Sequence, residues 1–199
     1  MSQPGRGGVI LGLTRLYERV PLERIGVLIG KDGAVKKEIE DRTGTKLSVD
    51  STTGSVVIEP ARPTTNADDV LRARDVVRAI ALGFSPDRAF RLLDEDQVLV
   101  VIDLKEYVGD KPNHIERIIG RIIGEEGKTR RIVEEVTGTY VSVHGTTVAI
   151  IGDYESSDIA KNAVELLING KPHAVVYRYL EDRMRALKRR RAFDLWLKP

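Results

Sequence analysis

The chain has 199 residues, of which 41% are hydrophobic and 31% are charged, with a formal net charge of +2 and no cysteine. This composition is typical of a globular protein, and the absence of cysteine excludes disulfides and thiolate metal sites. No apolar run is as long as the roughly 20 residues needed to span a bilayer, and Met1–Gly8 lacks the apolar segment of a signal peptide. We therefore expect a cytoplasmic protein with no membrane partner.

The first half of the chain predicts a compact series of short elements. They are a strand at Val9–Val20, helices at Leu22–Ile29 and Ala34–Arg42, strands at Lys46–Val49 and Ser55–Ile58, and a helix at Asp68–Leu82. A Gly-x-x-Gly turn, Gly30–Gly33, separates the first two helices, and Gly44 stands where the second should end. Gly83-Phe84-Ser85-Pro86 then opens a connecting helix over Asp87–Leu93.

The second half repeats the first. A shift of 94 residues places Ile29–Gly33 on Ile123–Gly127 and Thr43–Thr45 on Thr137–Thr139. The expected elements are a strand at Val98–Tyr107, helices at His114–Ile123 and Lys128–Val136, strands at Tyr140–Val143 and Thr147–Ile151, a helix at Ser156–Ile168, and a last helix from Gly170-Lys171-Pro172 to about Arg191.

Two copies of a β-α-α-β-β-α unit predict an α+β fold with two tandem domains. Each domain should be a three-stranded antiparallel sheet packed on helices. We expect a first domain at 1–83, a helical connector at 84–96, a second domain at 97–170, and a basic C-terminal helix and tail at 171–199.

The charges are unevenly distributed along the chain. Residues 1–94 carry 15 basic and 13 acidic residues, residues 95–177 carry 9 and 14, and residues 178–199 carry 8 and 3. A partner rich in phosphates is therefore attracted by the first segment and by the tail, and is repelled by the middle segment. Six basic residues and no acid lie between Arg183 and Arg191, so we expect this helix to contact an RNA backbone.

A Gly-x-x-Gly turn before a helix suits contact with a phosphate backbone. Glycine has no Cβ, so a strand of RNA can approach the backbone N–H groups, and the helix that follows presents its positive dipole end. The expected RNA-binding residues are Ile25, Ile29, Gly30, Lys31, Asp32, Gly33, Lys36 and Lys37 in the first copy, Gly124, Glu125, Glu126, Gly127, Lys128, Arg130 and Arg131 in the second, and Arg185, Lys188, Arg189 and Arg190 in the tail.

The order β-α-α-β-β-α, with Ile29–Gly33 before Thr43-Gly44 and Ile123–Gly127 before Thr137-Gly138, resembles the type I KH domain. In that family the turn clamps about four nucleotides of single-stranded nucleic acid. A KH domain usually carries Ile three residues after the second Gly, where this chain has Lys36 and Arg130. The second turn also places Glu125 and Glu126 where a phosphate should approach, which is unfavourable.

A closer resemblance is to the archaeal relatives of the small-subunit ribosome-assembly KH protein called partner of the Nob endonuclease. It is carried by Ile29–Ile39, by Gly83-Phe84-Ser85-Pro86 with Ala89-Phe90 and Leu92-Leu93, and by Arg121–Arg130. The resemblance implies a non-enzymatic factor that binds single-stranded RNA near the 3′ end of small-subunit rRNA. It also implies an association with the endonuclease that matures that end.

Two other functions remain open from the residues. One is a KH RNA-binding protein of RNA decay or translation, and the other is a metal-dependent nuclease using Asp94, Glu95 and Asp96, or Glu125 and Glu126. A P-loop is excluded because Ile122 stands at its first required Gly. The histidines are scattered, so we expect no metal and no cofactor. Phe193 and Trp196 are expected to anchor the C-terminus.

Overall fold

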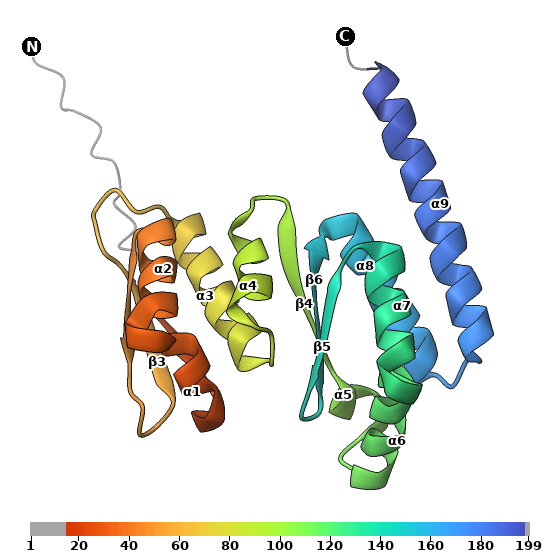
Figure 1. Ribbon diagram of the computed structural model, residues 1–199, viewed down its shortest axis with the longest axis horizontal. Coiled ribbons are helices and arrows are strands. Elements are labelled where there is room, and N and C mark those ends of the chain that lie inside the picture. The colour runs from red at the N-terminus through yellow and green to blue at the C-terminus, as the bar shows by residue number, and fades with distance from the viewer. Residues whose placement is uncertain (1–14, 198–199) are drawn as a thin grey trace, which may run out of the picture.

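The computed structural model describes residues 15–197, which form two α+β units joined by a short helical connector (Figure 1). The first unit contains β1 (Leu16–Arg19), α1 (Leu22–Ile29), η1 (Lys31–Gly33), α2 (Ala34–Thr43), β2 (Thr45–Val49), β3 (Ser55–Pro60) and α3 (Ala67–Ala81). The connector is α4 (Pro86–Ala89) followed by η2 (Phe90–Leu93).

The second unit has the same order with one added helix. It contains β4 (Gln97–Asp103), α5 (Leu104–Val108), α6 (Pro112–Ile123), η3 (Glu125–Gly127), α7 (Lys128–Thr137), β5 (Tyr140–His144), β6 (Thr147–Asp153) and α8 (Tyr154–Ile168), and α9 (His173–Leu197) follows it. The predicted fold class is confirmed, since each unit is a three-stranded antiparallel sheet of order β1-β3-β2 or β4-β6-β5 with helices packed on it.

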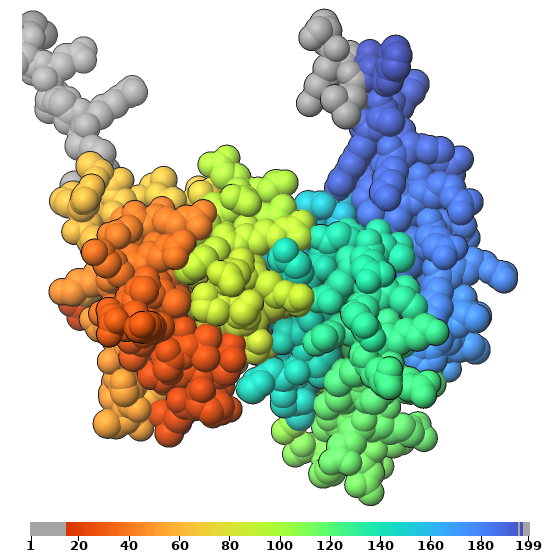
Figure 2. All heavy atoms as spheres, in the orientation of Figure 1, coloured from red at the N-terminus to blue at the C-terminus, as the bar shows by residue number. Residues whose placement is uncertain are grey.

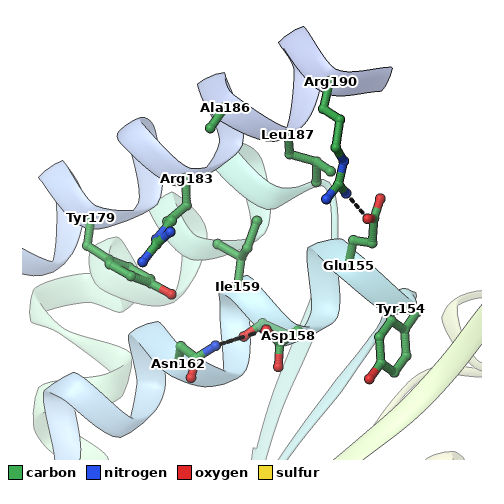
Figure 3. A pocket seen from close by; sticks show the side chains of 10 residues that line it. All are labelled: Tyr154, Glu155, Asp158, Ile159, Asn162, Tyr179, Arg183, Ala186, Leu187 and Arg190. Carbon is green, nitrogen blue, oxygen red and sulfur yellow. Dashed lines mark hydrogen bonds and ion pairs between the residues drawn. The ribbon is translucent and has the colours of Figure 1, made fainter. Parts of the chain in front are cut away.

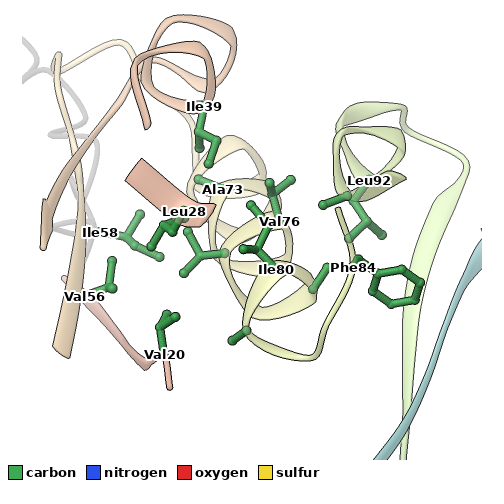
Figure 4. Packing of buried hydrophobic residues seen from close by; sticks show 14 of the residues in the cluster. Val20, Leu28, Ile39, Val56, Ile58, Ala73, Val76, Ile80, Phe84 and Leu92 are labelled. Carbon is green, nitrogen blue, oxygen red and sulfur yellow. The ribbon is translucent and has the colours of Figure 1, made fainter. Parts of the chain in front are cut away.

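Alternation along the strands decides which face of the first sheet is buried. Thr45 and Leu47 of β2 and Val56 and Ile58 of β3 are buried, whereas their neighbours along each strand are more exposed. Successive side chains of a strand point to opposite faces, so these residues share the face that packs on the helices. Figure 4 shows Ile58 and Val56 facing Leu28 of α1 and the apolar side of α3.

The repeated Thr-Gly-Thr sequence has a structural role. The Thr43 hydroxyl donates to the Ile39 carbonyl at 2.6 Å and shares a 2.7 Å hydrogen bond with the Thr45 hydroxyl. Thr137 and Thr139 repeat this pairing at 2.8 Å. Because all four side chains are buried, these hydrogen bonds fix the passage from helix to strand and are not available to a ligand.

The connector seals the outer face of the second sheet. Phe84 is 2% exposed and belongs to one apolar cluster with Leu92 of η2 and with Ala149 and Ile151 of β6. The Ser142 hydroxyl donates to the Leu82 carbonyl at 2.8 Å across the same contact. Figure 2 shows the connector filling the space between the two units. The connector and the second sheet therefore share one apolar cluster.

Three predicted elements need correction. The strand expected over Val98–Tyr107 ends at Asp103, because the Asp103 carboxylate accepts from the Lys105 N–H at 2.9 Å and begins α5. The connecting helix is one α-helical turn continued as a 3₁₀ turn. Only Leu16–Arg19 of the strand expected over Val9–Val20 is a strand in the described residues, and Val9–Thr14 lie outside them.

Helix α9 packs on the second unit and then projects beyond it (Figure 1). Its buried side chains are Val176, Leu180, Met184 and Leu187, which lie against α7 and α8. The expectation that Phe193 and Trp196 anchor the terminus is wrong, because they are 64% and 89% exposed on the part of α9 that has left the domain. No helix within residues 15–197 is both long and apolar enough to cross a membrane.

Candidate nucleic-acid interface

The first Gly-x-x-Gly turn has a backbone that few residues adopt. Gly30 has φ 74° and ψ 177°, Asp32 has φ 52°, and Gly33 has φ 79°. The Gly30 N–H donates to the Gly26 carbonyl at 2.9 Å and ends α1, and helix α2 starts at Ala34. The N-terminus of α2 therefore points out of the turn, with Lys31 and Asp32 exposed beside it.

The second turn repeats this geometry closely. Gly124 has φ 74° and ψ 174°, Glu126 has φ 49°, and Gly127 has φ 76°. The Gly124 N–H donates to the Gly120 carbonyl at 2.8 Å. The two turns thus present the same backbone shape, and they differ in the side chains that surround it.

The two glycines of each turn are required for different reasons. A Cβ on Gly30 would lie 2.9 Å from the Val35 backbone N, and one on Gly124 would lie 2.8 Å from the Thr129 backbone N. The first glycine therefore allows the turn to close on the following helix. A Cβ on Gly33 or Gly127 would meet nothing within 4 Å, so the second glycine faces open space where a strand of RNA can approach.

The cations predicted at the first turn differ in availability. Lys31 and Lys37 are exposed, whereas the half-buried Lys36 lies 3.9 Å from the Glu40 carboxylate. Glu40 also accepts from the Leu47 N–H at 2.7 Å, which ties α2 to β2. Lys31 and Lys37 are therefore the cations best placed for a phosphate at this turn.

The cations predicted at the second turn are arranged differently. Arg131 donates to the Glu126 carbonyl at 2.8 Å. Its positive charge therefore lies at the turn and offsets part of the negative charge of Glu125 and Glu126. Arg130 is half-buried with its Nε unpaired, and Lys128 is exposed. Glu134 corresponds to Glu40 in the repeat, accepts from the Val141 N–H at 2.8 Å, and is paired at 3.0 Å with Arg88 of the connector.

Ile25 and Ile29, the two aliphatic residues predicted to contact RNA, are not equally accessible. Ile25 is 5% exposed and packs in the core of the first unit, so it has almost no surface to offer a base. Ile29 and Val49 are half-buried at the edge of that core. In the β2–β3 loop, hydrogen bonds from Thr52 and Thr53 hold the pKa of Asp50 well below its usual range.

Several residues near the second turn were missed from the sequence. Arg117 and Arg121 of α6 and Tyr177 of α9 lie beside Gly124 and Lys128. The 94-residue shift also aligns Gly26 with Gly120, one helical turn before each Gly-x-x-Gly, and this match was available from the repeat alone. Tyr177 had no such signal, because the same shift places it on Gly83.

Comparison with known proteins places this geometry in a family. Residues 98–185 match the model for the second KH domain of PNO1, described as a eukaryotic-type KH domain (KH-domain type I), and residues 17–78 match the general KH domain model. KH domain-containing protein MJ0443 of Methanocaldococcus jannaschii is 47% identical over 180 residues, which are 90% of this chain and 78% of that protein. The chain belongs to the KH-domain family, in the branch of the PNO1 and Dim2p proteins.

Two further members of this branch are named for rRNA or for its processing. A crystal structure of the a/eIF2alpha–aDim2p–rRNA complex from Pyrococcus horikoshii OT3 contains a chain that is 50% identical, with a TM-score of 0.81, over 87% of this chain and 95% of that one. The pre-rRNA-processing protein pno1 of Aspergillus fumigatus is 33% identical over 140 residues, which are 68% of this chain and 55% of that protein. The chain spans about half the length of such eukaryotic relatives.

The acidic residues considered for a nuclease do not gather into a metal site in this KH protein. Within residues 15–197, no group of three or more His, Asp or Glu side chains is placed to hold a metal ion. Asp94, Glu95 and Asp96 lie between η2 and β4, and the Glu95 carboxylate is 3.5 Å from Arg72 of α3.

Some basic side chains of α9, the helix that follows the second KH unit, form ion pairs within the protein and others do not. Arg190 pairs with Glu155 of α8 at the hollow shown in Figure 3, and Arg191 lies 2.6 Å from Asp153. Arg185, Lys188 and Arg189 are exposed and form no ion pair with any described residue. The predicted contact of Arg190 with RNA therefore competes with an existing ion pair, and the other three cations are better placed.

Proposed function

We propose that this protein binds single-stranded RNA through its Gly-x-x-Gly turns and acts as a non-enzymatic rRNA-binding factor in small-subunit ribosome biogenesis. The observation that carries the proposal is the pair of turns with matching backbone angles, each open at its second glycine and followed by a helix N-terminus. The relatives named pre-rRNA-processing protein and the Dim2p structure solved with rRNA support it.

At the first turn, an RNA phosphate would approach Gly33 and the N-terminus of α2. Lys31 and Lys37 would supply positive charge on either side of that approach. The bases would lie toward Ile29 and the edge strand β2, where half-buried aliphatic side chains provide an apolar surface.

At the second turn, binding would depend on cations that offset Glu125 and Glu126. Arg131 already bonds to the turn, and Lys128 lies at its exit. The tail would add contacts from Arg185, Lys188 and Arg189 to the RNA backbone, which weaken with added salt and carry no base preference.

The finer target of the proposal is the 3′ end of small-subunit rRNA. Crosslinking of the protein to RNA in its source cells, followed by sequencing of the bound fragments, tests this directly. Enrichment of fragments from that end would support the proposal. A mixed population of messenger RNAs would instead support a KH protein of RNA decay or translation.

The protein partner that we propose is the endonuclease that matures the same end of the rRNA. Its co-purification with the full chain tests this part. Incubation of the purified protein alone with a 3′-extended rRNA fragment and Mg²⁺ or Mn²⁺ tests the non-enzymatic part. Cleavage that disappears when Asp94, Glu95 and Asp96, or Glu125 and Glu126, are replaced by alanine would make this protein a nuclease.

A further inference from the structure

A hollow lies against the second turn on the side where α9 begins. Its lining includes Arg117, Gly120 and Arg121 of α6, Lys128 of α7, and His173 and Tyr177 of α9. At the corresponding place after α3 the first unit has the shorter α4 and η2, so the part of this lining that comes from the long helix α9 belongs to the second turn. It is continuous with the turn, since Gly124 and Glu125 also border it.

The charge in this hollow favours a phosphate. Arg117 and Lys128 are exposed and form no ion pair or side-chain hydrogen bond with the described residues. Arg121 is held in place, because its Nε and Nη2 donate to the Leu167 and Lys171 carbonyls at 3.2 Å and 2.6 Å. Three cations thus border a space that contains one carboxylate, that of Glu125.

Gly120 leaves the floor of the hollow open. It lies inside α6, where a glycine destabilises a helix by about 1 kcal/mol relative to alanine. A Cβ at this position would meet nothing within 4 Å, so packing inside the protein does not require the glycine. A ligand that needs close contact with the helix backbone does require it.

An aromatic wall completes the hollow. The Tyr177 hydroxyl forms a 3.0 Å hydrogen bond with the Thr129 hydroxyl, and Thr129 packs directly under Gly124. The His173 and Tyr177 rings are 6.1 Å apart, and the His173 ring nitrogen is 3.0 Å from the Arg121 carbonyl. The Tyr177 ring is therefore held rigidly beside the turn, as a surface for stacking must be.

We propose that this hollow binds one nucleotide of single-stranded RNA that flanks the nucleotides clamped by the second turn. Its phosphate lies between Arg117 and Lys128, its backbone passes over Gly120, and its base stacks on Tyr177. This inference rests on the proposed RNA binding by the second turn. It adds a subsite built partly from α9, and it accounts for how an acidic turn retains RNA.

The test compares oligoribonucleotides of different length on the full chain. A tetranucleotide fills the turn, and pentamers or hexamers extended at either end also reach the hollow. The wild-type protein is expected to bind one of the extended RNAs at least about fivefold more tightly than the tetranucleotide, as base stacking on an aromatic ring implies. The end that gives the gain identifies the direction of the strand.

Gly120→Leu should remove this gain and leave tetranucleotide affinity unchanged, because leucine fills the floor of the hollow without disturbing the helix. Gly26→Leu, at the aligned position of the first unit, should keep the gain and is the matched control. Arg117→Ala should lower the slope of log affinity against log salt by about one for the extended RNA only. A terminal 4-thiouridine on that RNA should crosslink to Tyr177.

The outcomes separate the subsite from the proposed function. If the gain persists in Gly120→Leu, or if no extension raises the affinity of the wild type, the subsite is refuted while RNA binding stands. If no RNA of any length binds, the proposed function fails together with the subsite. Binding of an acidic peptide to the hollow, without any effect of RNA length, would overturn the subsite and assign the hollow to a protein partner.

Discussion

Exchanging the two turn sequences would measure how much the local charge contributes to RNA binding. The φ and ψ angles of Gly30, Asp32 and Gly33 agree within 4° with those of Gly124, Glu126 and Gly127, so each sequence should fit the other site. Lys31→Glu with Asp32→Glu makes the first turn acidic. Glu125→Lys with Glu126→Asp gives the second turn the Lys-Asp pair.

Each exchange alters the turn by two units of charge. Two charges at about 6 Å from a phosphate are worth about 1.4 kcal/mol at the dielectric constant of water, which corresponds to about a tenfold change in Kd. The acidic first turn should therefore bind at least about tenfold more weakly, and the second turn that carries Glu125→Lys with Glu126→Asp should bind more tightly. Both effects should shrink as salt is raised, because the turns are exposed.

Fluorescence anisotropy with a labelled single-stranded RNA at fixed salt gives the affinities, and thermal unfolding of each variant shows that the fold is intact. An Ala substitution at Asp41, which is exposed on the far turn of α2, serves as the charge-changing control. Unchanged affinity in the acidic first-turn variant would show that Gly30–Gly33 is not the RNA site.

Three further predictions concern the fold and the tail. In urea titrations, Gly30→Ala should lower the free energy of unfolding by about 3 kcal/mol and Gly33→Ala by about 1 kcal/mol. The two differ because only a Cβ at position 30 would collide with backbone atoms. Phe84→Ala should lower the free energy of unfolding by about 3–5 kcal/mol and split unfolding into two calorimetric transitions, because this side chain packs against both units. A single transition at the wild-type temperature would contradict that role. Trp196 is the only tryptophan and is exposed, so RNA bound along the tail should quench its fluorescence in a salt-dependent manner, and the absence of quenching would argue against tail contact.

Much of the fold followed from the repeat. The shift of 94 residues aligned the turns, and the periodicity of the flanking segments placed most helices within two residues of their observed ends. The prediction that one strand runs to Tyr107 was wrong, because a short apolar run is compatible with both a strand and a buried helix. The Asp103 N-cap decided the outcome there, and it acts through one local hydrogen bond.

The surroundings of the second turn depended on contacts between distant segments. Arg88 meets Glu134 across 46 residues, and Tyr177 meets Thr129 across 48. Neither pair is close in sequence, and neither has a counterpart in the first unit that the repeat could reveal. The predicted RNA contact of Ile25 had a related weakness, since spacing alone does not show whether an apolar residue faces the core or a ligand.

The difference between Val35 and Thr129 shows how the two KH units differ in packing while they keep the same backbone at the turn. Both side chains pack under the first glycine of their turn. Val35 offers only apolar contact, whereas Thr129 also holds the Tyr177 hydroxyl and so braces the turn against α9. The cations that offset the two carboxylates of the second turn, Arg117, Lys128 and Arg131, belong to α6 and α7, and α9 adds the ring of Tyr177 beside them. The first turn carries its own Lys31, and its unit is followed by the shorter α4 and η2, so the two turns differ both in charge and in the side chains that border them.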